Sequence, residues 1–136
     1  MAQQMRFELV TPEKLLFDKA VAHVVLPGEE GDLGVLPEHA PLITNLRPGL
    51  IEVYEQDSGA AERLFVKRGF AQVKGERLVV LAEDCLDPDD VDASDLDRRI
   101  SETEEDLADA GDDALARRKA ETDLAWMRPL RDAIGG

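Results

Sequence analysis

The chain has 136 residues, enough for one compact domain or for one small domain with an appendage. Its net charge of −14 excludes nucleic-acid binding and adsorption on anionic lipid, since both need a positive surface. Cys85 is the only cysteine, which excludes an internal disulfide and a cysteine metal cluster, and no apolar run approaches the roughly 18 residues of a membrane span. We therefore expect a soluble cytoplasmic protein, and an aliphatic core because aromatic residues make up only 4% of the chain.

Alternating apolar residues predict strands throughout the first half of the chain. The expected strands cover residues 5–10, 20–26, 42–46, 50–55, 63–67, 70–74 and 78–82. Turn residues separate them at 11–13, 27–28, 47–49, 57–59 and 74–76, and residues 78–82 are apolar on both faces, as a central strand requires. This pattern predicts an antiparallel β-sandwich or barrel and disfavours parallel βαβ folds.

One stretch of this half, Pro27 to Leu42, reads PGEEGDLGVLPEHAPL and combines dense turn residues with apolar ones. Glycines permit positive φ and prolines fix φ near −65°, so the stretch specifies one backbone path. We interpret it as a rigid loop that presents a surface.

The second half changes both charge and period. Residues 83–136 carry 18 acidic and 7 basic side chains, against 12 and 9 in residues 1–82, so we place domains at 1–86 and 87–136. Helix-spaced side chains predict two antiparallel helices separated by a break at 110–112: Leu96, Ile100, Thr103 and Leu107 on the first, then Ala116, Ala120, Leu124 and Met127. We expect Ser94 as the first N-cap and an end near Met127, because Pro129 removes a helical hydrogen bond. The narrow apolar face predicts a hairpin that leans on the sheet domain or on another protein, or that is mobile.

Residues for catalysis are scarce. No phosphate-binding or dinucleotide-binding glycine motif occurs, and the three serines lie in a turn or on the polar helices. His23 and His39 lack metal-ligand spacing, and we interpret them as a sheet-face residue and a residue packed in the loop. The sequence thus predicts no catalytic residue, no metal and no cofactor, with a small hydrolase that uses His39 and Glu38 or Asp32 as the remaining enzymatic alternative.

Two charged groups stand out. The carboxylates Glu29, Glu30 and Asp32 crowd one turn, which favours a solvated loop or a protein contact over an acid–base pair. Five of the seven basic residues in 83–136 follow residue 116: Arg117, Arg118, Lys119, Arg128 and Arg131. For this basic group we favour ion pairs with the neighbouring helix over contact with an acidic partner.

The stretch from Pro27 to Leu42, with the RPG at 47–49, ELVTPE at 8–13 and LAED at 81–84, resembles the N-terminal domain of the epsilon subunit of bacterial F-type ATP synthases, the counterpart of the mitochondrial delta subunit. The resemblance implies a β-sandwich of about ten strands followed by a two-helix hairpin. It also implies a non-catalytic part of the rotating central stalk, which binds the gamma subunit and the ring of c subunits and couples proton-driven rotation to ATP synthesis. Such a subunit is peripheral, on the cytoplasmic face of the bacterial inner membrane.

The resemblance assigns contacts residue by residue. It implies a c-ring contact at Glu29, Glu30, Gly31 and Asp32, and a gamma contact at Pro37, His39, Ala40, Pro41 and Leu42. The competing interpretation from another class is a free-standing acidic adaptor that shares the fold and docks its hairpin on a basic partner.

The family's hairpin can also inhibit ATP hydrolysis through basic residues that meet an acidic segment of the catalytic alpha and beta subunits, and Arg117, Arg118 and Lys119 are the candidates. Family members that bind ATP carry arginine and alanine where this chain has Ile100 and Ser101, so we expect weak or no ATP binding. Pro129, as a helix terminator, and the net charge of −11 of the second half oppose inhibition.

Overall fold

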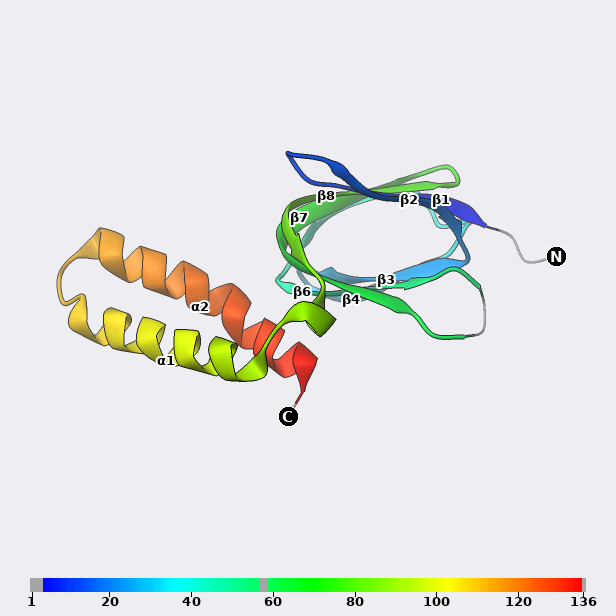
Figure 1. Cartoon of the computed structure of the whole chain (residues 1–136). Helices are drawn as coiled ribbons and strands as arrows, with labels where there is room; N and C mark the ends of the chain where they lie inside the picture. Colours follow the sequence, from blue (N-terminus) through cyan, green and yellow to red (C-terminus); the bar gives the residue numbers. More distant parts are fainter. Residues whose placement is uncertain (1–3, 57–58, 136) are drawn as a thin grey trace. The chain divides into compact units, whose positions relative to one another are not determined.

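The computed structural model describes residues 4–56 and 59–135, and the chain divides into two compact units, Met1–Asp87 and Pro88–Gly136. In the described residues, the first unit consists of eight strands. Figure 1 shows how they are arranged. They are β1 (Met5–Val10), β2 (Leu15–Val21), β3 (His23–Gly28), β4 (Gly31–Val35), β5 (Leu42–Leu46), β6 (Gly49–Tyr54), β7 (Glu62–Lys74) and β8 (Arg77–Leu86). The resemblance implied about ten.

The strands form one sheet that folds over onto itself. Its order is β2-β1-β8-β7-β5-β3-β4, and β6 pairs with both β3 and β7. Figure 1 shows β1, β2 and β8 in one layer facing β3, β4 and β6 in the other, which is the predicted sandwich. Every pairing is antiparallel except that of β1 with β8, which is parallel.

Alternation along β1 illustrates how the core forms. Met5, Phe7 and Leu9 are buried while Arg6 is exposed, as the sequence pattern predicts. The core between the layers is mostly aliphatic, with Phe7 and Phe17 in contact at a ring-centroid distance of 5.2 Å.

The expected strand at 20–26 is wrong at its start. The chain turns a corner at the buried Ala22, so that residues 20–21 end β2 and β3 begins at His23. Strand β2 was not predicted, because only Phe17 and Val21 of its seven residues point inward. Its pairing with β1 defines it, supported by a 2.5 Å ion pair between Arg6 and Asp18.

The expected strands at 63–67 and 70–74 are one strand, β7, which continues through an irregularity at Arg68 and Gly69. Strand β7 is long because it pairs with β6 through its first half and with β5 through its second. A turn expected at 57–59 lies partly outside the described residues. Strand β8 is central as predicted, since β1 and β7 flank it.

The second unit is a helical hairpin. A short 3-10 helix, η1 (Pro88–Asp90), precedes α1 (Ala93–Asp109) and α2 (Ala114–Ile134), which lie side by side in Figure 1. Gly111, with φ of 56°, lies in the predicted break. The predicted packing faces are confirmed in part: Leu96, Ala120, Leu124 and Met127 are buried, whereas Ala116 is exposed.

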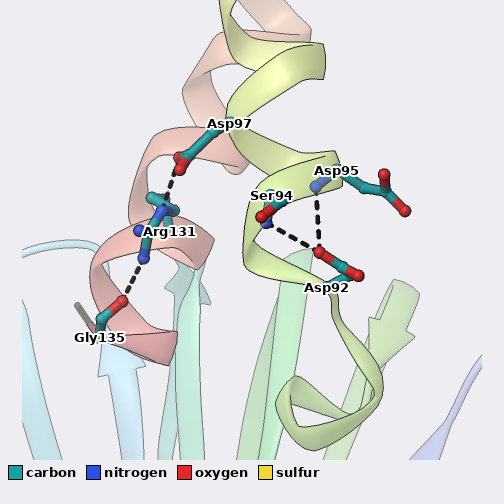
Figure 2. A network of polar contacts seen from close by, with 6 residues as sticks. All are labelled: Asp92, Ser94, Asp95, Asp97, Arg131 and Gly135. Carbon is teal, nitrogen blue, oxygen red and sulfur yellow. Dashed lines mark hydrogen bonds and ion pairs between the residues drawn. The ribbon is translucent and has the colours of Figure 1, made fainter.

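Two helix boundaries differ from the sequence prediction. The N-cap of α1 is Asp92 instead of Ser94; its carboxylate accepts hydrogen bonds from the backbone N–H groups of Ser94 (2.8 Å) and Asp95 (3.2 Å) (Figure 2). Helix α2 does not end before Pro129 but continues to Ile134. A proline costs the helix one hydrogen bond, yet the buried Met127 and Leu130 on either side of it hold the last turns in place.

Candidate functional site

The stretch from Pro27 to Leu42 is not a single loop, because its first part closes a tight hairpin between β3 and β4. Pro27 lies opposite Asp32 and Gly28 opposite Gly31, which leaves Glu29 and Glu30 as the turn. Gly31 has φ of 142°, a conformation that side chains disfavour, whereas every non-glycine residue described has negative φ. A Cβ at Gly28 would lie 2.6 Å from the Gly31 carbonyl oxygen, so both glycines are required by the turn.

Arg47 holds this turn, a role that sequence reasoning missed. Its Nη2 lies 2.5 Å from Oδ1 of Asp32, and its Nη1 donates to the carbonyl oxygen of Gly28. By contrast, neither Glu29 nor Glu30 forms an ion pair or side-chain hydrogen bond with any residue that the structure describes. The four predicted c-ring residues therefore lie together. Of their three carboxylates, Asp32 is already paired with Arg47, whereas Glu29 and Glu30 have no side-chain partner among the described residues.

The segment from Leu36 to Leu42 connects β4 to β5. The backbone N–H of His39 donates to the carbonyl oxygen of Leu36 at 2.9 Å, and His39 Nδ1 lies 2.7 Å from the carbonyl oxygen of Ala40. His39 is thus part of the loop's own structure, as predicted. No hydrogen bond joins it to Glu38 or Asp32 among the described residues, so the geometry of a hydrolase site is absent there.

The other histidine is also structural. His23 stacks on Tyr54 across β3 and β6 with ring centroids 4.1 Å apart, in agreement with its predicted place on a sheet face.

An apolar surface that the sequence analysis did not identify crosses the outer face of the sheet. Leu15, Val10, Leu81 and Phe70 occupy directly paired positions on β2, β1, β8 and β7, and we call them the outward apolar row. Leu15 is 52% exposed, and Leu81 and Phe70 are each 40% exposed. Ile43, on the neighbouring strand β5, is 69% exposed.

A cavity of about 610 Å³ lies at this row. Its lining includes Val10, Phe70 and Leu81 together with the charged pair Arg68 and Glu83. The Arg68 guanidinium donates to Glu83 at 2.7 Å and lowers the pKa of that carboxyl. A single exposed apolar residue on a strand is common and would not be noticed in the sequence. The strand register shows that these four residues are neighbours.

In the hairpin, the predicted basic group divides into two. Arg131 Nε donates to Asp97 at 2.6 Å and its Nη1 to the carbonyl oxygen of Gly135 (Figure 2), while Arg128 pairs with Glu104 at 3.0 Å. These two arginines form the predicted ion pairs between the helices.

The other three do not. Arg117, Arg118 and Lys119 are exposed, and none forms an ion pair with a residue that the structure describes. The preferred interpretation of these three as partners of the neighbouring helix is therefore wrong. They lie near the tip of the hairpin beside Leu115, which is 78% exposed.

The residues at the ATP-motif position contribute to packing and to the ion pairs. Ile100 is half-buried on α1, and Asp97 is already bound to Arg131. The absence of ATP binding stays a prediction.

No cluster of three or more metal-ligating side chains occurs in residues 4–56 and 59–135. Cys85 is half-buried, and burial raises the pKa of its thiol to about 11, which makes it a poor nucleophile. None of the described helices has the length and hydrophobicity to cross a membrane.

The two units match two family models. Residues 4–88 match the β-sandwich domain of the ATP synthase delta/epsilon chain, and residues 92–136 match the C-terminal domain of the ATP synthase epsilon chain. Among curated relatives, the ATP synthase epsilon chain of Parvibaculum lavamentivorans is 44% identical over 134 residues, which cover 98% of this chain and 100% of that one. The epsilon chain of Rhodospirillum centenum is 46% identical over 138 residues, covering 98% and 94%.

Solved structures share the fold. A chain in the mitochondrial ATP synthase of Euglena gracilis superposes with a TM-score of 0.86 at 22% identity, covering 96% of this chain and 81% of that chain. A chain in the central stalk and c-ring of the Tetrahymena thermophila mitochondrial enzyme gives 0.65 at 14% identity, covering 97% of each. The chain therefore belongs to the ATP synthase epsilon chain family and is a non-catalytic subunit of that complex.

Proposed function

We propose that this chain is the part of the rotating central stalk that joins the gamma subunit to the c-ring and couples proton-driven rotation to ATP synthesis. In this proposal it is a peripheral subunit on the cytoplasmic face of the bacterial inner membrane. Its relatives from bacteria carry the name of the epsilon chain, and one structural neighbour belongs to an assembly described as central stalk and c-ring.

The outward apolar row is the observation that supports gamma binding by this chain. Soluble proteins rarely expose large contiguous apolar patches, and such patches mark binding surfaces, those for other proteins among them. The segment assigned to gamma from the sequence ends at Leu42, the first residue of β5, and the exposed Ile43 follows it. Strand β5 pairs with β7, which contributes Phe70 to the row. We therefore extend the gamma contact from Pro37, His39, Ala40, Pro41 and Leu42 to Ile43 and the outward apolar row.

The acidic turn is the proposed c-ring contact. Glu29 and Glu30 have no side-chain partner in the part of the chain that the structure describes, so basic groups on c-subunit loops can pair with them without breaking a contact there. The turn and the gamma surface belong to one sheet and are joined by β3, β5 and β7. A sheet that carries both contacts transmits torque without a hinge between them.

A binding measurement tests the gamma contact. Purified full-length chain carrying Phe70→Glu and Leu81→Glu should lose gamma binding by at least tenfold in a pull-down titration, because two carboxylates would be buried at the interface. Leu115→Glu is the matched control, since Leu115 is also an exposed leucine but lies in the hairpin. Undiminished gamma binding by the double variant, with its fold verified by circular dichroism, would refute this surface.

A second function, inhibition of ATP hydrolysis by the hairpin, gains support from Arg117, Arg118 and Lys119. These three exposed cations have no ion-pair partner in residues 4–56 and 59–135, so they can meet an acidic segment of the catalytic subunits without breaking an ion pair there. The objection from Pro129 falls, because α2 continues through it. The net charge of −11 still opposes an acidic target.

Hydrolysis by the whole complex tests this second function. The triple variant Arg117→Gln, Arg118→Gln and Lys119→Gln should hydrolyse ATP several-fold faster than the wild-type complex, and removal of residues 88–136 should do the same. Equal rates in all three complexes would reject inhibition by this hairpin and leave the stalk role standing.

A further inference from the structure

Arg47 connects three parts of the chain that meet at the acidic turn. It follows β5 directly, and its guanidinium reaches back across the sheet to the β3–β4 hairpin. Its two terminal nitrogens bind different acceptors, namely the carbonyl oxygen of Gly28 before the turn and the carboxylate of Asp32 after it. One side chain thereby spans both ends of the turn that carries Glu29 and Glu30.

Backbone hydrogen bonds reinforce the same connection. The N–H of Arg47 donates to the carbonyl oxygen of Pro27 at 2.9 Å, and the N–H of Glu29 donates to the carbonyl oxygen of Asn45 at 2.9 Å. These two bonds attach Pro27 and Glu29, the neighbours of Gly28, to the end of β5. Among the hydrogen bonds of the described residues, only that of the Arg47 guanidinium to Asp32 joins the end of β5 to the outgoing strand β4.

We propose that Arg47 is a positioning residue for the c-ring contact: it holds the turn so that Glu29 and Glu30 face the partner, and Asp32 serves as its internal anchor. This inference rests on the proposed function of the turn. It reassigns Asp32, which the sequence analysis grouped with the contact residues, to a supporting role.

The chemistry requires an arginine. A guanidinium presents donors in a rigid planar fork and can serve two acceptors at fixed separation, whereas the lysine ammonium is a single point charge. Arg47→Lys should keep the attraction to Asp32 but lose the simultaneous bond to Gly28. Reversing the pair, with Asp32→Arg and Arg47→Asp in one chain, restores the ion pair with the charges exchanged but also loses the bond to Gly28, because a carboxylate cannot donate to a carbonyl oxygen.

The first experiment measures the turn itself, by amide hydrogen exchange in the isolated full-length chain. Exchange at Gly31, which pairs with Gly28 across the turn, should be at least fivefold faster in Arg47→Gln. It should be intermediate both in Arg47→Lys and in the reversed pair, because each keeps an ion pair but loses the bond to Gly28. Arg77→Gln, which breaks the ion pair of Arg77 with Glu8 elsewhere on the sheet, is the matched control and should leave the turn unchanged. Unchanged exchange in Arg47→Gln would overturn the proposal.

The second experiment measures coupling, as protons pumped per ATP hydrolysed by the reconstituted complex. Arg47→Gln and the double variant Glu29→Gln, Glu30→Gln should each lower this ratio at least twofold, and the reversed pair should lower it less than Arg47→Gln does. If neither variant lowers the ratio, the c-ring contact itself is wrong. If only the glutamate variant lowers it, the contact stands and positioning by Arg47 is wrong. If the reversed pair slows exchange in the turn relative to Arg47→Gln but does not raise the ratio above that of Arg47→Gln, Asp32 touches the partner and its role as an internal anchor is wrong.

Discussion

Gly69 is the position where one added methyl group should harm the sheet most. It lies at the irregularity in β7, directly opposite Ala82 on the central strand β8, and it lines the cavity at the outward apolar row. A Cβ built there would lie 2.3 Å from the carbonyl oxygen of Leu81 and 3.0 Å from Cα of Ala82. Both neighbours are backbone atoms, which cannot move aside as a side chain can.

The expected magnitude follows from that distance. Ordinary contact begins at 3.4 Å, so Gly69→Ala forces a local separation of about 1.1 Å between β7 and β8. Overpacking of this kind costs about 1–3 kcal/mol, and each ladder hydrogen bond that is lengthened or lost costs about 0.5–1.5 kcal/mol. We expect Gly69→Ala to lower the free energy of unfolding of the sheet unit by about 2–4 kcal/mol.

Urea unfolding of the full chain measures this, followed by nuclear magnetic resonance signals of the sheet so that the hairpin does not obscure the transition. Gly34→Ala is the control, because Gly34 also lies in a strand but its added Cβ meets nothing within 4 Å. We expect that control to change stability by about 0.5 kcal/mol or less. A loss below 1 kcal/mol in Gly69→Ala would show that the strands separate freely and would refute the reasoning.

Three further predictions concern the hairpin and the cysteine. Asp92→Ala should cost α1 about 1 kcal/mol in urea unfolding followed at 222 nm, and Ser94→Ala almost nothing; equal losses would reject Asp92 as the cap. Pro129→Ala should slow amide exchange in the last turns of α2, because a proline inside a helix costs up to about 3 kcal/mol relative to alanine; faster exchange would mean that the ring's packing outweighs its missing N–H. Alkylation of Cys85 by iodoacetamide should keep accelerating with pH beyond 9, since burial raises its pKa to about 11, and a plateau near pH 9 would contradict this. Because the folded state favours the thiol, its contribution to stability is complete below about pH 9 and is lost as pH rises to about 11.

Elements defined by their own residues were predictable from the sequence. The strands at 5–10, 42–46 and 78–82 follow from alternation and local turn residues, and the break near Gly111 follows from glycine alone. Elements defined by distant partners were not. Strand β2 has few inward residues and depends on pairing with β1, and the last turns of α2 depend on buried residues beyond a proline.

The site shows the same division. The acidic turn was located from the sequence because Gly28 and Gly31 mark it locally. Its connection to Arg47 spans fifteen residues and depends on how β5 meets β3. Predicting the outward apolar row would require the register of four strands. A shift of one residue in any strand would turn the side chain that this strand contributes to the row into the core.

The parallel pairing of β1 with β8 has a consequence for synthesis of the chain. Residues Arg6–Val10 lie beside Arg77–Leu81, so β1 cannot complete its pairing until β8 has left the ribosome. At about 5–20 residues per second, the β1–β2 hairpin waits on the order of 4–14 s with Phe7, Leu9 and Phe17 uncovered. The sheet is thus completed by its oldest segment, and a chain released before residue 81 would expose an unpaired apolar edge, a template for aggregation.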